Sequence, residues 1–316
     1  MSAPLLELRG LSKAFHRHGA PPLRAVDDVS LHVNAGECVA LVGESGSGKS
    51  TLARIALQLI VPDRGEVFLG GRSLARLAPS QLREARLAMQ PIFQDPSAAF
   101  NPRRTVCAIL GQALAQLPAA DLSDAQLSAL LARVELRPGM DYLNRYPHEL
   151  SGGQRQRLAI ARAIATRPAV IIADEPLSGA DVSIRAQILN LLADLQRVSG
   201  VAYVLVTHDM LVARAFSHRV SVMYQGRIVE EGPTGEVLAT PRHPYTQSLI
   251  AAVQSLDAPW QAPVVIRNEA IPSTGQGCAF FSRCSMSGPA CTAAVPELRE
   301  IGRGHRAACH FATTQT

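Results

Sequence analysis

The chain has 316 residues, 47% of them hydrophobic, and a formal net charge of +5 at pH 7. This composition is typical of a globular protein, and the length allows one large domain with a smaller unit. No apolar run approaches the roughly 18 residues that a membrane span needs. Glu7 and Arg9 interrupt the apolar N-terminus, which makes it a poor signal peptide. No block of like charges suggests a nucleic-acid partner, so we expect a cytosolic protein without one.

The first part of the chain is expected to be rich in strands. Residues 5–8 form a candidate strand, and residues 26–33 alternate apolar and polar side chains, as a half-buried strand does. A loop containing a glycine and two prolines is expected between them, over residues 16–22. A short buried strand over residues 38–42 follows.

Directly after that strand the chain has the pattern G-x-x-x-x-G-K-[ST], which is typical of phosphate-binding loops. A strand, a glycine-rich turn and a helix start direct backbone N–H groups and the helix dipole at an anion. In such a loop the lysine reaches the β- and γ-phosphates of a nucleotide and the serine hydroxyl binds Mg²⁺. The predicted nucleotide-binding residues are Gly43, Glu44, Ser45, Gly46, Ser47, Gly48, Lys49, Ser50 and Thr51.

The expected secondary structure changes twice in the middle of the chain. After a strand over 65–69 and another ending near 93, helical patterns cover 105–117 and 123–134, and a third helix follows residue 153. Strands over 169–173 and 201–206 then flank a helix over 183–198. Alternating strands and helices predict a parallel sheet with helices on its faces. We therefore expect an α/β domain with a helical insertion at about residues 95–165.

The C-terminal part divides at a proline-rich stretch. Two hairpin strands over 220–224 and 227–229 and two short helices complete the first domain, which we place at residues 1–256. Pro259, Pro263 and Pro272 mark a linker. Residues 257–316 are expected to form this linker and a cysteine-rich, loop-rich extension, too small to build a good core alone.

Two acids end the apolar strand over 169–173. Asp174, at the carboxyl end of a buried strand in a chain with a phosphate-binding loop, is suited to hold Mg²⁺. Glu175 points the other way and suits a carboxylate that activates the attacking water. The alternative is an acidic pair that simply faces solvent.

A second candidate anion site lies before the third helix of the insertion. Ser151, Gly152, Gly153 and Gln154 place a serine and two glycines at a helix N-terminus. Alone, this pattern also fits an ordinary N-cap.

Together these motifs resemble those of the nucleotide-binding subunits of ABC transporters. Residues 43–50 match the family's Walker A motif, 171–175 its Walker B motif and 150–154 its signature motif. The resemblance implies a P-loop ATPase fold with a parallel sheet core, an antiparallel β subdomain and a helical signature subdomain. It also implies ATP and Mg²⁺ as cofactors.

The same resemblance assigns further residues. Gln94 matches the Q-loop glutamine that touches Mg²⁺ and couples to the membrane subunits, and His208 matches the switch histidine at the γ-phosphate. Asp181 matches the D-loop aspartate, in a loop where Gly179 and Ala180 replace the usual Ala-Leu. Phe15 matches the aromatic residue that stacks on adenine; a plain strand residue is the alternative.

Three segments are similar to the oligopeptide/dipeptide importer branch of the family: residues 94–97 with 100–103, residues 181–187, and residues 242–247. This implies an ATPase subunit that powers peptide uptake through two integral-membrane permease subunits. A second, paralogous ATPase subunit and an extracytoplasmic solute-binding protein are the further expected partners, and the expected location is the cytoplasmic face of the membrane. An importer of nickel or another metal chelate and a soluble non-transport ABC ATPase are the alternatives.

Cysteines cluster in the C-terminal extension. Cys278, Cys284, Cys291 and Cys309 are separated by five, six and seventeen residues. Four thiolates can close a tetrahedral site for zinc or an iron–sulfur cluster, and wide gaps favour the bulkier [4Fe–4S] cube. The importer branch also implies this cluster. Zn²⁺ and metal-free thiols or disulfides are the alternatives, and a structural role is expected for this segment.

Overall fold

The computed structural model describes residues 3–17, 19–96, 99–117, 122–179, 181–253 and 277–313. Some sequence-based predictions lie outside these residues. They are Ser97 of the Q-loop segment, Ala180 of the D-loop, and the linker with Pro259, Pro263 and Pro272.

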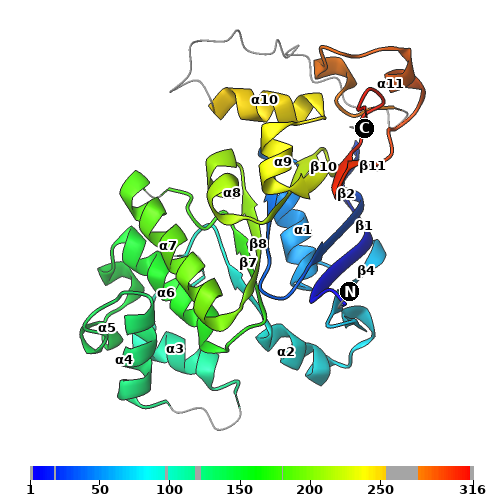
Figure 1. Ribbon diagram of the computed structural model, residues 1–316. Helices are drawn as coiled ribbons and strands as arrows, with labels where there is room; N and C mark the ends of the chain where they lie inside the picture. The colour runs from blue at the N-terminus through cyan, green and yellow to red at the C-terminus, as the bar shows by residue number, and fades with distance from the viewer. Residues whose placement is uncertain are drawn as a thin grey trace.

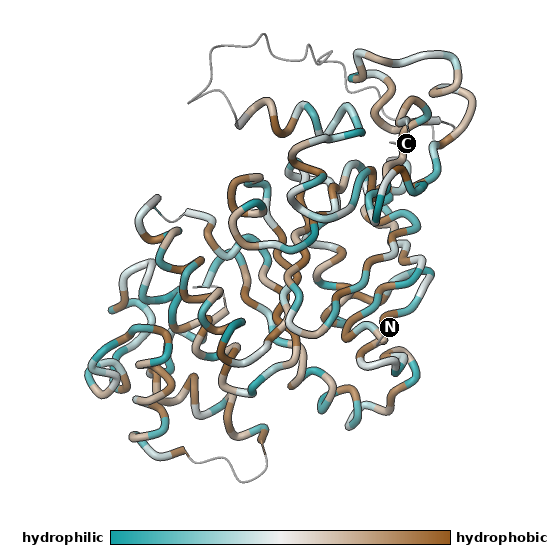
Figure 2. The backbone as a smooth tube through the Cα atoms, in the orientation of Figure 1, coloured by the Kyte–Doolittle hydropathy of each residue, from teal (hydrophilic) through white to brown (hydrophobic). Residues whose placement is uncertain are grey.

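An eight-stranded sheet in the order β11-β12-β10-β9-β3-β8-β7-β6 forms the centre of the molecule (Figure 1). The strands from β9 to β6 are parallel, as expected from the alternation of strands and helices. Buried apolar residues predominate in these strands, because helices cover them, and Figure 2 shows this hydrophobic centre. The parallel strands are β3 (Cys38–Val42), β6 (Met89–Ile92), β7 (Val170–Asp174), β8 (Ala202–Thr207) and β9 (Arg219–Tyr224).

A four-stranded antiparallel sheet lies beside the central sheet, in the order β2-β1-β4-β5. Its first two strands differ from the prediction. The loop expected over residues 16–22 is instead a continuation of the hairpin, because Phe15 pairs with Leu23 and the ladder extends to the hairpin turn. The strands are β1 (Leu6–Arg17), β2 (Ala20–Val33), β4 (Arg64–Leu69) and β5 (Arg72–Ser73).

Helices α3 to α6 lie between β6 and β7 along the chain. In space they form a lobe at one side of the sheet (Figure 1). Their apolar faces share one core with strands β7 and β8. The α-helices are α1 (Lys49–Ala56), α2 (Pro79–Leu87), α3 (Val106–Leu114), α4 (Asp124–Arg133), α5 (Met140–Leu143), α6 (Gly152–Ala165), α7 (Val182–Ser199), α8 (Met210–Phe216), α9 (Thr234–Ala239), α10 (Pro244–Val253) and α11 (Pro289–Ala293). Three 3₁₀ turns are η1 (Leu74–Arg76), η2 (Pro147–Glu149) and η4 (Phe281–Arg283).

The cysteine-rich tail joins the central sheet. Strand β12 (His305–Ala307) pairs with β10 (Arg227–Pro233), and β11 (Arg299–Gly302) pairs with β12. These two strands were not predicted, since their short segments show no clear alternation. By adding strands to an existing sheet, the tail obtains hydrogen bonds and apolar partners that it could not supply alone.

Across the described parts of the chain, none of the helices combines the length and apolar character required to cross a bilayer. The predicted fold class is confirmed: a parallel sheet core, an antiparallel β subdomain and a helical subdomain are all present.

Candidate nucleotide site

The phosphate-binding loop runs from the end of β3 to the start of α1. Its glycines are required at two positions. At Gly43, with φ of 154°, a Cβ atom would lie 2.2 Å from the carbonyl oxygen of Met223. At Gly48, with φ of 106°, it would lie 2.0 Å from the carbonyl oxygen of Ala25. No side chain fits either contact, so the loop is packed tightly against β2 and β9.

Lys49 lies inside this loop and is 4% exposed. Its ammonium group donates hydrogen bonds to the carbonyl oxygens of Gly43 and Glu44, both at 2.8 Å. Burial lowers the pKa of Lys49, while the carboxylates of Glu175 and Asp174 oppose that shift. The cation is therefore held where a phosphate chain would meet it.

Ser50 and Asp174 are brought together from α1 and β7. The Ser50 hydroxyl donates to Asp174 Oδ1 at 3.0 Å. Burial raises the pKa of Asp174, and the hydrogen bond from Ser50 and the charge of Arg54 counteract this. A hydroxyl and a carboxylate oxygen this close are ligands that suit the hard cation Mg²⁺.

Glu175 lies between two residues that come from other strands. Its carboxylate accepts a hydrogen bond from Gln94 Nε2 at 3.3 Å and lies 3.3 Å from His208 Nδ1. Gln94 follows β6 and His208 follows β8, the strands on either side of β7. Three residues predicted separately thus meet at the carboxyl ends of adjacent parallel strands.

A pocket of about 970 Å³ lies at this site; Asp174 and His208 are not among the residues that line it. Phe15, which is 38% exposed, contributes an aromatic ring to its wall. This volume is at the upper end of the range of about 300–1,000 Å³ common for small-molecule sites. The predicted residues that line it are Phe15, Ser45, Gly46, Gly48, Lys49, Ser50, Thr51, Gln94 and Glu175.

The signature residues are not among those that line this pocket. Ser151 and Gly152 are exposed, while Gly153 and Gln154 are half-buried. The Ser151 hydroxyl accepts from the N–H of Gln154, whose side chain accepts from the N–H of Ser151 in return. This capping box fixes an exposed N-terminus of α6.

Asp181 is likewise not among the residues that line the pocket. It is the N-cap of α7, where its carboxylate accepts from the N–H of Ile184 at 2.9 Å and from the Ser183 hydroxyl at 2.7 Å. These bonds lower the pKa of Asp181.

Sequence reasoning missed the contribution of the C-terminal part to this site. The Tyr245 hydroxyl accepts a hydrogen bond from the backbone N–H of Glu44 at 2.7 Å. Arg283 donates two hydrogen bonds of 2.8 Å to the Glu44 carboxylate. Gly277, Ala279 and Val295 also line the nucleotide pocket. Because the tail lies outside every nucleotide motif, no sequence signal indicated these contacts.

The metal site that the spacing of the four tail cysteines predicts remains a prediction. Among the residues described by the structure, no group of three or more His, Cys, Asp or Glu side chains could hold a metal ion. Cys278 and Cys284 lie in a cluster with Phe280, whereas Cys309 lies in another with Ile301. Burial raises the pKa of Cys278 to about 11, and the nearby thiols of Cys284, Cys291 and Cys309 add to this shift.

Comparisons with known proteins agree with this arrangement. The family model for ABC transporters matches residues 26–178, and the model for the oligopeptide/dipeptide transporter C-terminal region matches residues 229–291. A probable peptide ABC transporter ATP-binding protein, y4tS, from Sinorhizobium fredii is 44% identical, covering 98% of this chain and 90% of that protein. The oligopeptide transport ATP-binding protein AppF from Bacillus subtilis is 38% identical, covering 97% of each chain.

A similar solved structure is the dimeric structure of MJ0796, a bacterial ABC transporter cassette. It has a TM-score of 0.65 and 31% identity, and the match covers 72% of this chain and 98% of that chain. The phosphate-binding loop, the paired acids and the whole-length relatives together show that the chain belongs to the ABC transporter family, as an ATP-binding subunit.

Proposed function

We propose that the chain hydrolyses ATP to power the uptake of dipeptides or oligopeptides through partner membrane subunits. The observation that carries the ATPase role is the meeting of Lys49, Ser50 and Glu175 at one pocket, with Asp174 hydrogen-bonded to Ser50. The peptide substrate rests on the relatives, which are named for peptide import or oligopeptide transport.

Binding begins at the phosphate-binding loop. Its backbone N–H groups and Lys49 hold the phosphate chain, and the ring of Phe15 stacks on the adenine. Ser50, Asp174 and Gln94 would hold Mg²⁺, which supplies charge neutralisation at the phosphates. The glycines allow the backbone to approach the phosphate oxygens closely.

Hydrolysis uses Glu175 as the general base. A water oxygen attacks the γ-phosphorus, the bond from phosphorus to the ADP oxygen breaks, and Glu175 accepts the proton of the water. Gln94 and His208 hold the carboxylate from two sides, each at 3.3 Å. As the family's switch histidine, His208 would also contact the γ-phosphate.

The exposed signature supports a two-subunit site. We propose that Ser151, Gly152, Gly153 and Gln154, with Asp181, complete the nucleotide site of a second ATPase subunit, a paralogue in a heterodimer. The structural relative MJ0796 is described as dimeric. Two permease subunits and an extracytoplasmic solute-binding protein complete the proposed transporter, which places this chain at the cytoplasmic face of the membrane. Residues 1–256 form the ATPase domain in this proposal, and residues 257–316 the linker and extension.

The rival functions differ in what they predict. A nickel or metal-chelate importer shares most motifs, but the relatives named above carry peptide names. A soluble ABC ATPase without a transport role would not copurify with integral-membrane subunits. Copurification with permease subunits from detergent-solubilised membranes therefore separates transport from non-transport roles.

Glu175→Gln tests the catalytic proposal. The amide still fills the space of the carboxylate but cannot accept the proton of water, so we expect ATP binding to persist and turnover to fall by about 10²-fold or more. The ATP-bound variant should accumulate as a closed dimer, seen by size-exclusion chromatography coupled to light scattering. Glu84→Gln changes an exposed glutamate of α2 and should behave as wild type. Near-normal ATPase rates in Glu175→Gln would remove Glu175 from the mechanism.

The tail cysteines carry a separate proposal, the binding of a [4Fe–4S] cluster or, alternatively, of Zn²⁺. Its support is the donor set: four free thiols lie within one small unit, and Cys284, Cys291 and Cys309 are close enough to Cys278 to raise its pKa. Metal analysis of the purified protein tests this proposal. Anaerobically purified protein should be brown and contain about four iron atoms per chain, whereas one zinc per chain indicates the alternative. Metal-free protein with titratable thiols contradicts both.

A further inference from the structure

Glu44, the second residue of the phosphate-binding loop, is held on three sides. Its carbonyl oxygen accepts from Lys49 and its N–H donates to the Tyr245 hydroxyl. Its carboxylate receives the two 2.8 Å hydrogen bonds from Arg283. Two of these three contacts come from outside the nucleotide motifs, 201 and 239 residues away along the chain.

The partners of Glu44 belong to a packed aromatic cluster. Tyr245, Tyr224 and Phe280 are buried, with ring centroids 4.6 to 5.5 Å apart. The Arg283 guanidinium lies 5.7 Å from the Tyr224 ring centroid and 5.6 Å from that of Phe280. Flat guanidinium groups stack well on aromatic faces, so this cluster orients the Arg283 fork toward Glu44.

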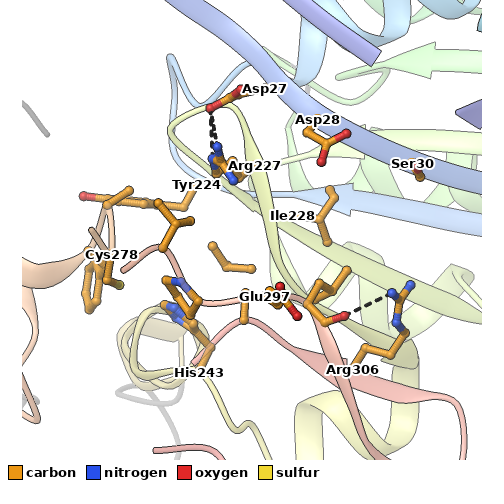
Figure 3. Close-up of a pocket in the computed structure, with 17 residues that line it drawn as sticks. Asp27, Asp28, Ser30, Tyr224, Arg227, Ile228, His243, Cys278, Glu297 and Arg306 are labelled. Carbon is orange, nitrogen blue, oxygen red and sulfur yellow. Dashed lines mark hydrogen bonds and ion pairs between the residues drawn. The ribbon is translucent and has the colours of Figure 1, made fainter. Parts of the chain in front are cut away.

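The tail segment around Arg283 also borders the nucleotide pocket. Ala279 lines both this pocket and a neighbouring one of about 500 Å³. Figure 3 shows the neighbouring pocket, with Tyr224 and Cys278 on one side and the ion pair of Asp27 with Arg227 close by. The contact between tail and loop is thus part of a continuous interface.

The ion pair between Arg283 and Glu44 affects the charge that a bound ATP would meet. A free carboxylate on the phosphate-binding loop would repel the negatively charged phosphate chain. Arg283 neutralises Glu44, and its two hydrogen bonds hold the pKa of that carboxyl below its usual range. The bidentate geometry also fixes the direction of the carboxylate.

We propose that Arg283 is a positioning residue for ATP binding that acts through Glu44, so that the C-terminal extension is part of the nucleotide-binding machinery. This inference rests on the proposed ATP site. Tyr245 supports the same loop residue through the backbone.

A double-mutant cycle on the full-length chain tests the proposal. ATP affinity is measured by isothermal titration calorimetry without magnesium, so that no turnover occurs. We expect Arg283→Met to weaken ATP binding about five- to tenfold, because Glu44 is then unneutralised and free to turn. In a Glu44→Gln background the same change should alter the dissociation constant by less than about twofold.

Further variants separate positioning from simple loss of structure. Arg283→Lys keeps the charge but not the fork, and should bind ATP with an intermediate affinity. Arg303→Met changes an exposed arginine of the β11–β12 turn and should match wild type. In the assembled transporter, Arg283→Met should raise the KM for ATP and leave kcat unchanged. A purely structural role would instead lower the fraction of binding-competent protein and kcat.

The outcomes are distinct. Wild-type affinity in Arg283→Met overturns the inference, as does an equal loss of affinity in the Glu44→Gln background. If Arg283→Met does not fold, Arg283→Lys provides the same comparison in both backgrounds. Failure of the wild-type chain itself to bind ATP contradicts the proposed ATP site and not only the role of Arg283.

Discussion

Glu175 adopts a backbone conformation that is uncommon for its residue type. Its φ is 47°, and its N–H donates to the carbonyl oxygen of Val206 on β8. Such left-handed geometry costs a non-glycine residue about 1 kcal/mol or more, so surrounding contacts must maintain it. Here Gln94 and His208 hold the Glu175 carboxylate, and the carbonyl oxygen of Val206 on β8 holds the Glu175 backbone N–H. This conformation places the Glu175 carboxylate, the proposed general base, at the nucleotide pocket.

Burial of His243 should make the stability of the protein depend on pH. It is 2% exposed, and its Nδ1 accepts from the N–H of Tyr245 at 3.1 Å. Burial lowers the pKa of His243 to about 4, against a weaker opposing effect of Glu230. The unfolded chain, with a histidine pKa of about 6.5, therefore binds more protons than the folded chain between these two values. Stability should fall as the pH drops through this window.

His243→Asn tests this linkage, because asparagine keeps an acceptor for the Tyr245 N–H and does not titrate. Between pH 7.5 and pH 5.0 the wild type should lose about 2 kcal/mol more free energy of unfolding than the variant. Urea denaturation at the two pH values measures both. His148→Asn, at an exposed position, should follow the wild type. Parallel pH profiles for wild type and His243→Asn contradict the assignment.

At the scale of elements, the N-terminus of α6 is built like that of α4. Ser151 caps α6 and Ser123 caps α4, each by accepting the N–H of the third residue that follows. Loss of either cap should cost about 1 kcal/mol of stability. Only α6 also presents two glycines beside its serine, and only α6 is proposed to face the ATP of a partner subunit.

Ser151→Ala and Ser123→Ala therefore form a matched pair. Both should destabilise the chain to a similar extent, but only Ser151→Ala should lower ATP turnover, by about tenfold or more in the assembled transporter. ATP affinity of the isolated chain should be retained in both, since Ser151 is not among the residues that line its own pocket. Equal turnover in the two variants would remove the signature from the partner's site.

The elements that sequence predicted well are those encoded locally. The phosphate-binding loop and the acid pair at the end of β7 each depend on a few consecutive residues. The hairpin of β1 and β2 was underestimated, because backbone pairing continues through residues with no alternating pattern.

Features that depend on tertiary packing were not predictable. The contact of Arg283 with Glu44 joins residues far apart along the chain, and neither position stands out in its own segment. The four tail cysteines stand apart from this limit. Their residue type and spacing predict one shared metal site, and that site stays a prediction.

At the scale of the whole molecule, the nucleotide pocket is bordered by all the main parts except the helical lobe. The antiparallel sheet supplies Phe15, the segments that follow β6 and β7 supply Gln94 and Glu175, and the tail supplies Ala279. The exposed signature lies in the helical lobe, at the start of α6. A second ATPase subunit that brings its own signature residues to this pocket would complete the enclosure of ATP. The proposed site therefore needs this partner subunit.

Peptide uptake by a reconstituted transporter tests the central claim most directly. Proteoliposomes would contain this chain with its permease subunits and second ATPase subunit, and the solute-binding protein would be added outside. We predict that labelled di- and oligopeptides accumulate only with ATP on this chain's side, that Glu175→Gln abolishes accumulation, and that nickel is not taken up. Uptake of nickel but not of peptides, or peptide uptake that persists in Glu175→Gln, would contradict the account.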